Sequence, residues 1–273
     1  VGLPRRHGLR RRQMYDLPAL RPQTDALWAG IAAELRARGV NAPGALTRAA
    51  DVHAPWRDPA LLLGQTCGYP FWHALRGHVR LVATPVYAAP GCDGPTYRSA
   101  IIVRQDDPAQ GLPACRGYRP AVNGRDSQSG HNALRAAVAP LAGEASFFSA
   151  ALETGAHLAS AKAVAAGEAD IAAIDCVTWA LAQRWAPEAV AGLRRIGWTP
   201  AAPALPFITA GGQEDAVVQA LQDTLYAALA SPTLAEARSA LMLADVAVLR
   251  EEAYSTIPAM EVAAEAAEQP ALL

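Results

Sequence analysis

The chain has 273 residues, of which 52% are hydrophobic, enough to bury one large core or two smaller ones. Charged residues make up 18%, and the 21 glycines and 21 prolines are spread along the chain, so the composition is that of a globular protein rather than a disordered one. No run of 18 apolar residues occurs, which argues against a membrane-spanning helix.

The formal net charge of -1 conceals an uneven distribution. Residues 1–13 contain five arginines and no acid, which leaves 19 basic and 25 acidic residues in the rest of the chain, a net charge of -6. An acidic body argues against nonspecific nucleic-acid binding, which requires a basic surface. We expect residues 1–13 to be a solvated Arg-rich leader or extension, with a nucleic-acid or membrane arm as the alternative.

Four cysteines are present: Cys67, Cys92, Cys115 and Cys176. None belongs to a Cys-x-x-Cys pair or has a histidine at metal-ligand spacing, so neither a metal site nor any other cofactor site is predicted. One or two disulfides are compatible with this count, but the sequence does not pair the cysteines. The alternative is that most of them serve as small buried hydrophobic residues.

The first half of the chain predicts one helix followed by four strands. Thr24 is a candidate cap for a helix that ends near Gly39, with Leu27, Ile31 and Leu35 on its buried face. Apolar or alternating runs then predict strands at 61–63, 80–87, 99–104 and 119–122. The segment 88–97, rich in proline and glycine, is predicted to be a turn-rich crossing.

The second half predicts a helix after residue 130, a helix over 156–166, a strand over 170–175 and a helix over 177–185. Strands are expected at 193–198 and 207–209, separated by a Pro-rich crossing at 199–206. Three helices are expected to complete the chain, over about 218–229, 234–243 and 257–268.

Strands that alternate with helices predict an α/β fold in which each lobe has a mostly parallel sheet flanked by helices. The two crossings divide this pattern. We expect a discontinuous outer lobe, residues 14–92 and 203–273, with residues 98–199 inserted as a middle lobe. Ligands of such folds bind in the crevice at the carboxyl ends of the strands.

The strongest local signal is a polar loop after the fourth strand that contains Ser127, Gln128, Ser129 and Gly130. Two hydroxyls and free backbone N–H groups at a helix start favour an anion. Simple N-capping by one serine is the alternative, although Ser-x-Ser-Gly exceeds what a cap requires. The loop is not a Walker A motif, because it lacks the Gly-Lys-Ser/Thr ending.

Three further segments offer polar groups to the crevice. Gln65, Thr66 and Tyr69 follow a predicted strand and are candidate ligand contacts, with a polar turn as an equally weighted alternative. His157 lies at a helix start and Asp175 at the end of an apolar strand. Asp175 is placed to bind a ligand amine, to orient His157 or to cap the next helix.

Several segments occur in the order found in one family. They are Met14-Tyr-Asp-Leu-Pro18, Gln65-Thr-Cys-Gly-Tyr-Pro70, Tyr97-Arg-Ser-Ala-Ile-Ile-Val-Arg104, Ser127-Gln-Ser-Gly130, Gly155-Ala-His157-x-x-Ser160, the strand that ends at Asp175, and Pro203-Ala-Leu-Pro-Phe207. Over about residues 14–260 this series resembles the phosphate/phosphite/phosphonate solute-binding proteins of ABC transporters, which have a two-lobed, type II periplasmic-binding fold.

The resemblance implies that the serine loop and His157 hold a small oxyanion, that Asp175 meets an amine or hydroxyl of the ligand, and that Tyr15 and Tyr97 close the other side. It also implies closure of the lobes about the crossings, an ABC-transporter permease as partner and a periplasmic location. We expect a monomer. Because residues 1–13 have no hydrophobic signal segment, a cytoplasmic location is the alternative.

Two rival functions share this fold. One is a cytoplasmic enzyme in which Cys67 would be the nucleophile and His157 its base, although no nucleophile motif is present. The other is a soluble sensor that reports the ligand to a partner protein.

Overall fold

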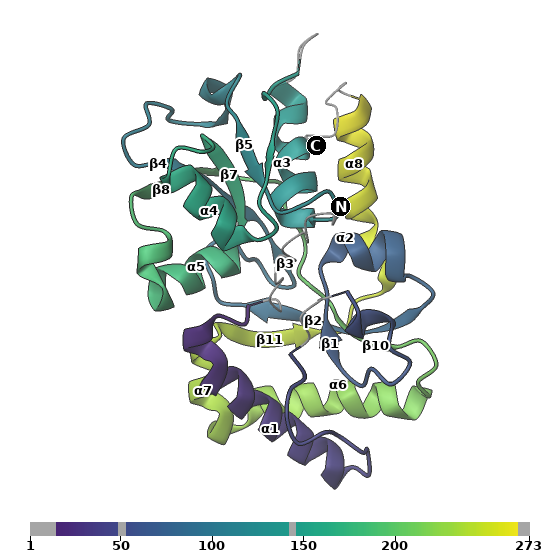
Figure 1. The fold of residues 1–273 in the computed structure, drawn as a ribbon. Helices are drawn as coiled ribbons and strands as arrows, with labels where there is room; N and C mark the ends of the chain where they lie inside the picture. The colour runs from purple at the N-terminus through teal and green to yellow at the C-terminus, as the bar shows by residue number, and fades with distance from the viewer. Residues whose placement is uncertain (1–14, 49–52, 142–145, 267–273) are drawn as a thin grey trace, which may run out of the picture.

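The computed structural model describes residues 15–48, 53–141 and 146–266, which fold into two lobes stacked one above the other (Figure 1). This confirms the two-lobed α/β fold. Within these ranges no helix is both long and apolar enough to cross a membrane.

The outer lobe is built on a four-stranded sheet in the order β1-β10-β2-β11. Its strands are β1 (Gly64–Gln65), β2 (Val79–Tyr87), β10 (Phe207–Ala210) and β11 (Leu243–Ala247). Helices α1 (Arg21–Ala37), α6 (Asp215–Ala230) and α7 (Ala235–Ala240) cover the face away from the other lobe (Figure 1). Leu35 of α1 and Leu221 and Leu225 of α6 are among the buried residues that join helices and sheet in one core.

The inserted lobe contains a five-stranded sheet in the order β6-β5-β7-β4-β8. The strands are β4 (Ser99–Arg104), β5 (Pro120–Val122), β6 (Leu152–Glu153), β7 (Ile171–Asp175) and β8 (Leu193–Trp198). Helices α3 (Ala133–Val138), α4 (His157–Ala165) and α5 (Cys176–Trp185) flank the sheet.

Side chains of β4 and β7 alternate between two cores, as the period of two in a strand requires. Ile102 and Ile174 pack with Val164 of α4, whereas Ile101 and Ala173 join the cluster on the opposite face, which includes Leu134 of α3. Both faces of this sheet are therefore buried.

The prediction of mostly parallel sheets is wrong. All neighbouring strands described in the outer sheet are antiparallel, and in the inserted lobe only β5 pairs in parallel, with β6 and with β7. The chain leaves the outer lobe after β2 and returns through β10, and it enters the inserted lobe through β4 and leaves through β8. Strands that carry the chain out and back at one boundary run in opposite directions, so each such pair is antiparallel.

The two predicted crossings exist and are hydrogen-bonded to each other. Strand β3 (Thr96–Tyr97) of the first pairs antiparallel with β9 (Ala202–Pro203) of the second, with Thr96 opposite Pro203 and Tyr97 opposite Ala202. The turn before β3 contains Gly91 and Gly94, both at positive φ. The boundary between the lobes is thus a short two-stranded ladder.

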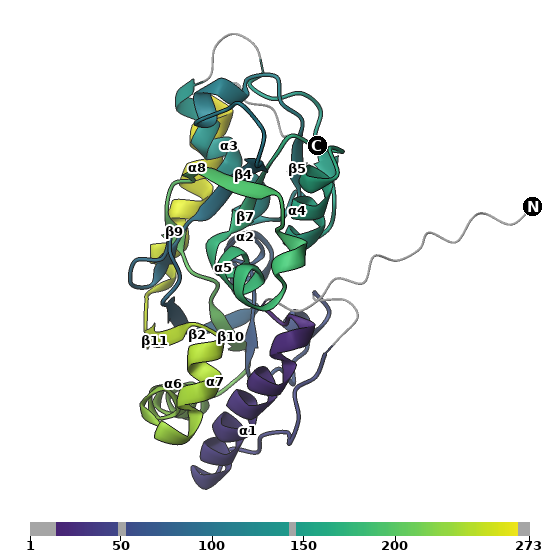
Figure 2. The ribbon, with the colours of Figure 1, turned by 90° about the vertical axis from the view of Figure 1, so that its left-hand side faces the viewer.

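Helix α8 (Thr256–Ala266) packs along α3 of the inserted lobe, although the division drawn from the sequence places it with the outer lobe (Figures 1 and 2). The amide of Asn132 donates to the carbonyl of Ile257 at 3.0 Å. The α8 side chain of Glu261 accepts a hydrogen bond from Tyr69 of the outer lobe at 2.6 Å. Helix α8 therefore contacts both lobes.

Two elements differ from the sequence-based predictions. The strand expected at 61–63 lies directly after that segment, at Gly64–Gln65, and the helix expected to reach residue 243 ends earlier, so that residue 243 begins β11 (Leu243–Ala247). Met242 adopts a φ of +54°, a left-handed conformation that ends the helical segment and turns the chain into the strand.

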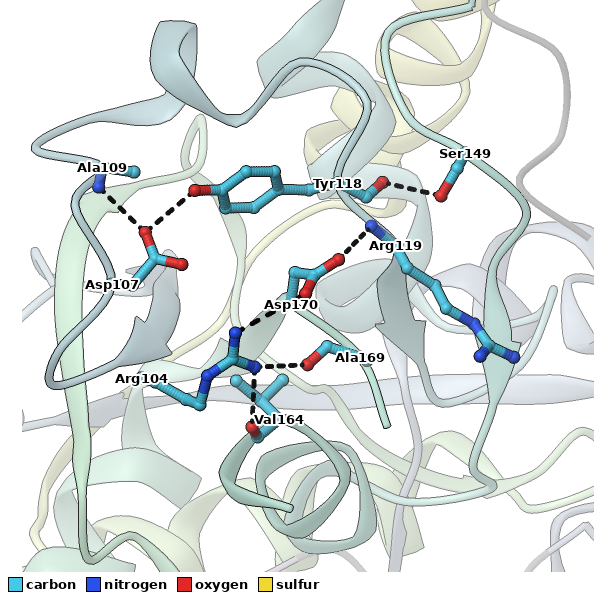
Figure 3. Close-up of polar contacts among 9 residues, drawn as sticks. All are labelled: Arg104, Asp107, Ala109, Tyr118, Arg119, Ser149, Val164, Ala169 and Asp170. Carbon is cyan, nitrogen blue, oxygen red and sulfur yellow. Dashed lines mark hydrogen bonds and ion pairs between the residues drawn. The ribbon is translucent and has the colours of Figure 1, made fainter. Parts of the chain in front are cut away.

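The end of the inserted sheet remote from the outer lobe is fixed by a polar network (Figure 3). Asp170, just before β7, accepts from the backbone N–H of Arg119 at 2.8 Å, and Arg104 donates to the carbonyls of Val164 and Ala169 at 3.4 and 3.1 Å. Asp170 is therefore structural, while Asp175 ends the same strand at the side that faces the crevice.

Tyr254 offers a test of how the outer lobe is held together, because its buried phenol bonds residues from two separate segments of the chain. Its hydroxyl donates to the carbonyl of Ala204 and contacts Thr84 Oγ1, both at 2.8 Å. We expect Tyr254→Phe to lower the free energy of unfolding by about 1–3 kcal/mol, because buried partners lose their hydrogen bonds while the ring stays packed. Urea denaturation against Tyr226→Phe, a change at an exposed tyrosine, measures this, and equal stabilities would contradict it.

Candidate functional site

The serine loop lies at the carboxyl end of β5, where Ser127 caps the helical segment that continues into α3. Ser127 Oγ accepts from the N–H of Gly130 at 3.0 Å, and a π-helical turn, Gln128–Asn132, follows. A Cβ on residue 130 would lie 2.7 Å from Cγ of Asn123, so the turn needs a glycine there. Ser127, Gln128 and Ser129 are buried, and single π-turns of this kind occur frequently at functional sites.

His157 joins this loop from the start of α4. Its Nε2 lies 2.8 Å from Ser129 Oγ, so the fold brings together two residues to which the family resemblance assigns a common role. Part of the residue is exposed, but Nδ1 is buried, and burial lowers the pKa of the imidazole to about 3. His157 is therefore neutral at physiological pH, and it acts as a hydrogen-bonding group rather than a cation.

Ser99, the first residue of β4, stabilises the serine loop through a hydrogen bond. Its hydroxyl donates to the carbonyl of Ser129 at 3.0 Å, and its N–H donates to Thr199 Oγ1 at 2.8 Å. The sequence analysis did not select either residue. The sequence did contain evidence for Ser99, because a serine at the end of an otherwise apolar strand needs a polar partner there.

Asp175 is almost completely buried and accepts three hydrogen bonds. Oδ1 accepts from the N–H groups of Val177 and Thr178 at 2.8 and 2.9 Å, and Oδ2 accepts from the phenol of Tyr15 at 2.8 Å. Burial raises the pKa of this carboxyl to about 6, even though these three donors favour the charged form. Asp175 both caps α5 and binds the phenol of Tyr15.

Tyr97 connects the ladder of crossings to the site. Burial, and then the charges of Cys67 and Asp175, raise the pKa of its phenol, while the nearby hydroxyl of Ser129 lowers it. The phenolic oxygen has no hydrogen-bond partner of acceptable geometry among the described residues. A buried hydroxyl in this state is costly, so it is available to a ligand.

The two lobes touch at the serine loop. The N–H of Gln128 donates to Sγ of Cys67 at 3.4 Å, and His53 lies 3.4 Å from Asp126 across the same boundary. The segment after β1 and the loop after β5 are therefore in contact.

The remaining candidates use their polar groups differently. Gln65 donates to the phenol of Tyr87 and the carbonyl of Leu205, both at 3.1 Å, and Tyr69 binds Glu261 of α8. Thr66 is fully buried, and its hydroxyl contacts the carbonyl of Cys67 at 3.3 Å. Gln65 and Tyr69 therefore support neighbouring elements.

The pair of Cys67 and His157 that the enzyme alternative requires is not formed, and no metal cluster is evident among residues 15–48, 53–141 and 146–266. Burial raises the pKa of Cys67 to about 11, and its sulfur accepts from Gln128, whereas His157 binds Ser129. No group of three or more metal-ligating side chains is found in these ranges.

A cavity of about 600 Å³ lies elsewhere, between α1 and β1 in the outer lobe. It is lined mainly by apolar side chains such as Trp28, Leu62 and Leu225, and it shares Gln65 with the candidates above. None of the serine-loop residues lines it, so it is separate from the site.

The raised pKa of Asp175 predicts a pH effect on stability. Between about pH 4 and pH 6 the folded protein binds a proton that the unfolded chain has released, so the free energy of unfolding falls as pH rises through this window. Asp175→Asn cannot ionise, so its stability relative to the wild type should grow by about 2–3 kcal/mol from pH 4 to pH 7. Denaturant titrations of both proteins across this range measure the change; a difference independent of pH would contradict it.

Solved structures with a similar fold come from several bacteria. PhnD1 from Prochlorococcus marinus in complex with methylphosphonate has a TM-score of 0.70 at 14% identity, over 90% of this chain and 93% of that one. A binding-protein component of an ABC phosphonate transporter from Pseudomonas aeruginosa has a TM-score of 0.72 at 17% identity, over 91% of this chain and 84% of that one. A Xanthomonas citri protein bound to chloride ion has a TM-score of 0.70 at 17% identity, over 94% of this chain and 96% of that one. At these identities the likeness shows the fold.

A comparison with curated proteins gives no match. The family model of the periplasmic phosphonate substrate-binding proteins of ABC transporters matches residues 57–254, well over half of the chain, and includes Tyr97, the serine loop, His157 and Asp175. This chain therefore belongs to that family, whose members bind solutes for transport and are not enzymes.

Proposed function

We propose that the serine loop, Tyr97 and His157 form the seat of a small oxyanion of the phosphonate, phosphate or phosphite kind. The observation that carries this proposal is the buried, unpartnered phenol of Tyr97 beside Ser129, whose hydroxyl is already oriented by His157. An anion that accepts from both hydroxyls would satisfy the phenol and stabilise the group at the helix start.

The site would neutralise the anion without a lysine or arginine side chain. His157 is uncharged, Lys162, Arg98 and Arg125 are exposed, and Arg98 donates to the carbonyl of Thr199. Hydroxyls, backbone N–H groups and the helix dipole would share the charge. Each hydrogen bond to a charged oxygen contributes about 1.5–3 kcal/mol, so four or five, after the cost of ordering, support micromolar or tighter binding.

Asp175 and Tyr15 would face the other end of the ligand. The carboxylate already accepts from Tyr15 and from two backbone N–H groups. It retains lone pairs for one more donor, so an ammonium or hydroxyl group on the ligand would pair with it. Such a group would distinguish an aminoalkyl phosphonate from phosphate.

Closure around the ligand would present the protein to a transporter. The contacts between Cys67 and Gln128 and between His53 and Asp126 form only where the lobes approach, so a ligand that touches both lobes favours this state. The family implies a small anionic ligand and a transporter partner. We further propose that this chain acts in the periplasm as a monomer that delivers its ligand to an ABC-transporter permease, and that nucleic acid is not a partner.

Ser129→Ala tests the seat. Isothermal titration of protein stripped of ligand by unfolding and refolding, against phosphate, phosphite, methylphosphonate, 2-aminoethylphosphonate and sulfate, should give one-to-one binding of at least one anion. Loss of a hydrogen bond to a charged oxygen should weaken that binding about 10- to 150-fold in Ser129→Ala.

The matched control is Ser149→Ala in the same lobe. Ser149 is exposed, and its hydroxyl donates to the carbonyl of Tyr118 at 3.1 Å, remote from the crevice (Figure 3). Its removal should leave the dissociation constant unchanged. Wild-type affinity in Ser129→Ala, or binding to none of the five anions, would overturn the proposed seat.

A further inference from the structure

Two of the four free thiols lie next to each other at the boundary between the lobes. Sγ of Cys92 is 3.4 Å from Sγ of Cys176, although the residues are 84 positions apart in the chain. The other two cysteines have different neighbours: Cys67 accepts from the N–H of Gln128, and Cys115 contacts the carbonyl of Gly111 at 3.7 Å. The fold thus selects a single cysteine pair where the sequence left the pairing open.

The backbone on both sides holds this pair in place. The N–H of Cys92 donates to the carbonyl of Ala89 at 3.0 Å, within the first crossing, and the N–H of Cys176 donates to the carbonyl of Arg98 at 3.1 Å. Between them, Gly91 allows the close approach, because a Cβ there would lie 3.0 Å from Cβ of Cys176 and 2.7 Å from the ring of Trp198. With φ at +100°, this position also requires a glycine for its backbone conformation.

We propose that Cys92 and Cys176 form a disulfide that ties the first crossing to the start of α5. A disulfide has an S–S distance of about 2.05 Å, so the sulfurs need to approach by little more than 1 Å. The family is periplasmic, and the periplasm is an oxidising compartment in which disulfides form and persist.

The reaction requires a disulfide oxidant, such as a thiol–disulfide oxidoreductase or oxidised glutathione. Cys92 is partly exposed, so its thiolate attacks the oxidant and forms a mixed disulfide, releasing one thiol of the oxidant. Cys176, which is buried, then displaces the second thiol. Two protein thiols lose two protons and two electrons, and one oxidant disulfide becomes two thiols.

The bond would act on the framework of the ligand site. Cys176 directly follows Asp175, and Cys92 belongs to the turn that leads into β3 and Tyr97. The link would therefore hold the end of β7 against the crossing and close a long loop, which restricts the unfolded chain. It does not depend on which anion the protein binds.

The test is to count and map thiols before and after oxidation of the folded protein with oxidised glutathione. After an acid quench and removal of the oxidant, titration of the denatured protein with a thiol reagent should show a fall from four free thiols to two. The four cysteines lie on separate tryptic peptides, and the linked pair should join 81–98 to 163–184. Four remaining thiols, or a bond that involves Cys67 or Cys115, would overturn the proposal.

Two variants separate this pair from general oxidation. Cys92→Ser should abolish the loss of thiols and the linked peptide, whereas Cys115→Ser should retain both. The oxidised wild type should also unfold at a higher guanidinium midpoint than the reduced protein, a shift that Cys92→Ser should lack. The same midpoint in both redox states would disprove the structural role.

Discussion

The short ladder between β3 and β9 holds the two crossings side by side, and the arrangement of both lobes follows from it. Thr96 and Tyr97 pair with Pro203 and Ala202, so the chain passes out of the outer lobe and back into it at one place. That constraint makes β2 and β10 antiparallel in one lobe and β4 and β8 antiparallel in the other. It also sets Tyr97 at the crevice, which gives one residue a part in both the boundary and the site.

The electrostatics of the crevice are unusual for an anion-binding protein, because its buried polar groups are neutral or acidic. Burial keeps His157 uncharged, whereas Asp175, with a pKa raised to about 6, is mostly ionised near neutral pH, so the fixed charge that these two residues contribute is negative. At the proposed site, the favourable field for an anion would come from hydroxyls and from the N-terminal end of the helical segment that follows Ser127. The proposed site would select a ligand through directed hydrogen bonds, and the Asp175 carboxylate would disfavour anions that have no hydrogen-bond donor.

Helix α8 adds a second connection between the lobes. It packs on α3, receives the amide of Asn132, and binds Tyr69 of the outer lobe through Glu261. Movement of the lobes would therefore have to preserve or exchange these contacts. The cavity between α1 and β1 lies away from this boundary, and the polar residues of the serine loop have no part in it.

The sequence alone predicted most of the local elements, the two crossings, the serine loop and Asp175 at a strand end, because these depend on periodicity, glycine positions and caps within a few residues. Strand β4 was placed at its observed residues, and the family resemblance named both the serine loop and His157, which the structure shows in contact. Strand direction was not predicted, since a pattern of alternating helices and strands does not reveal where the chain crosses back from one lobe to the other. Nor did the sequence identify Ser99, the position of α8 or the pairing of Cys92 with Cys176, because each depends on contacts between distant residues that only the packed tertiary structure brings within bonding distance.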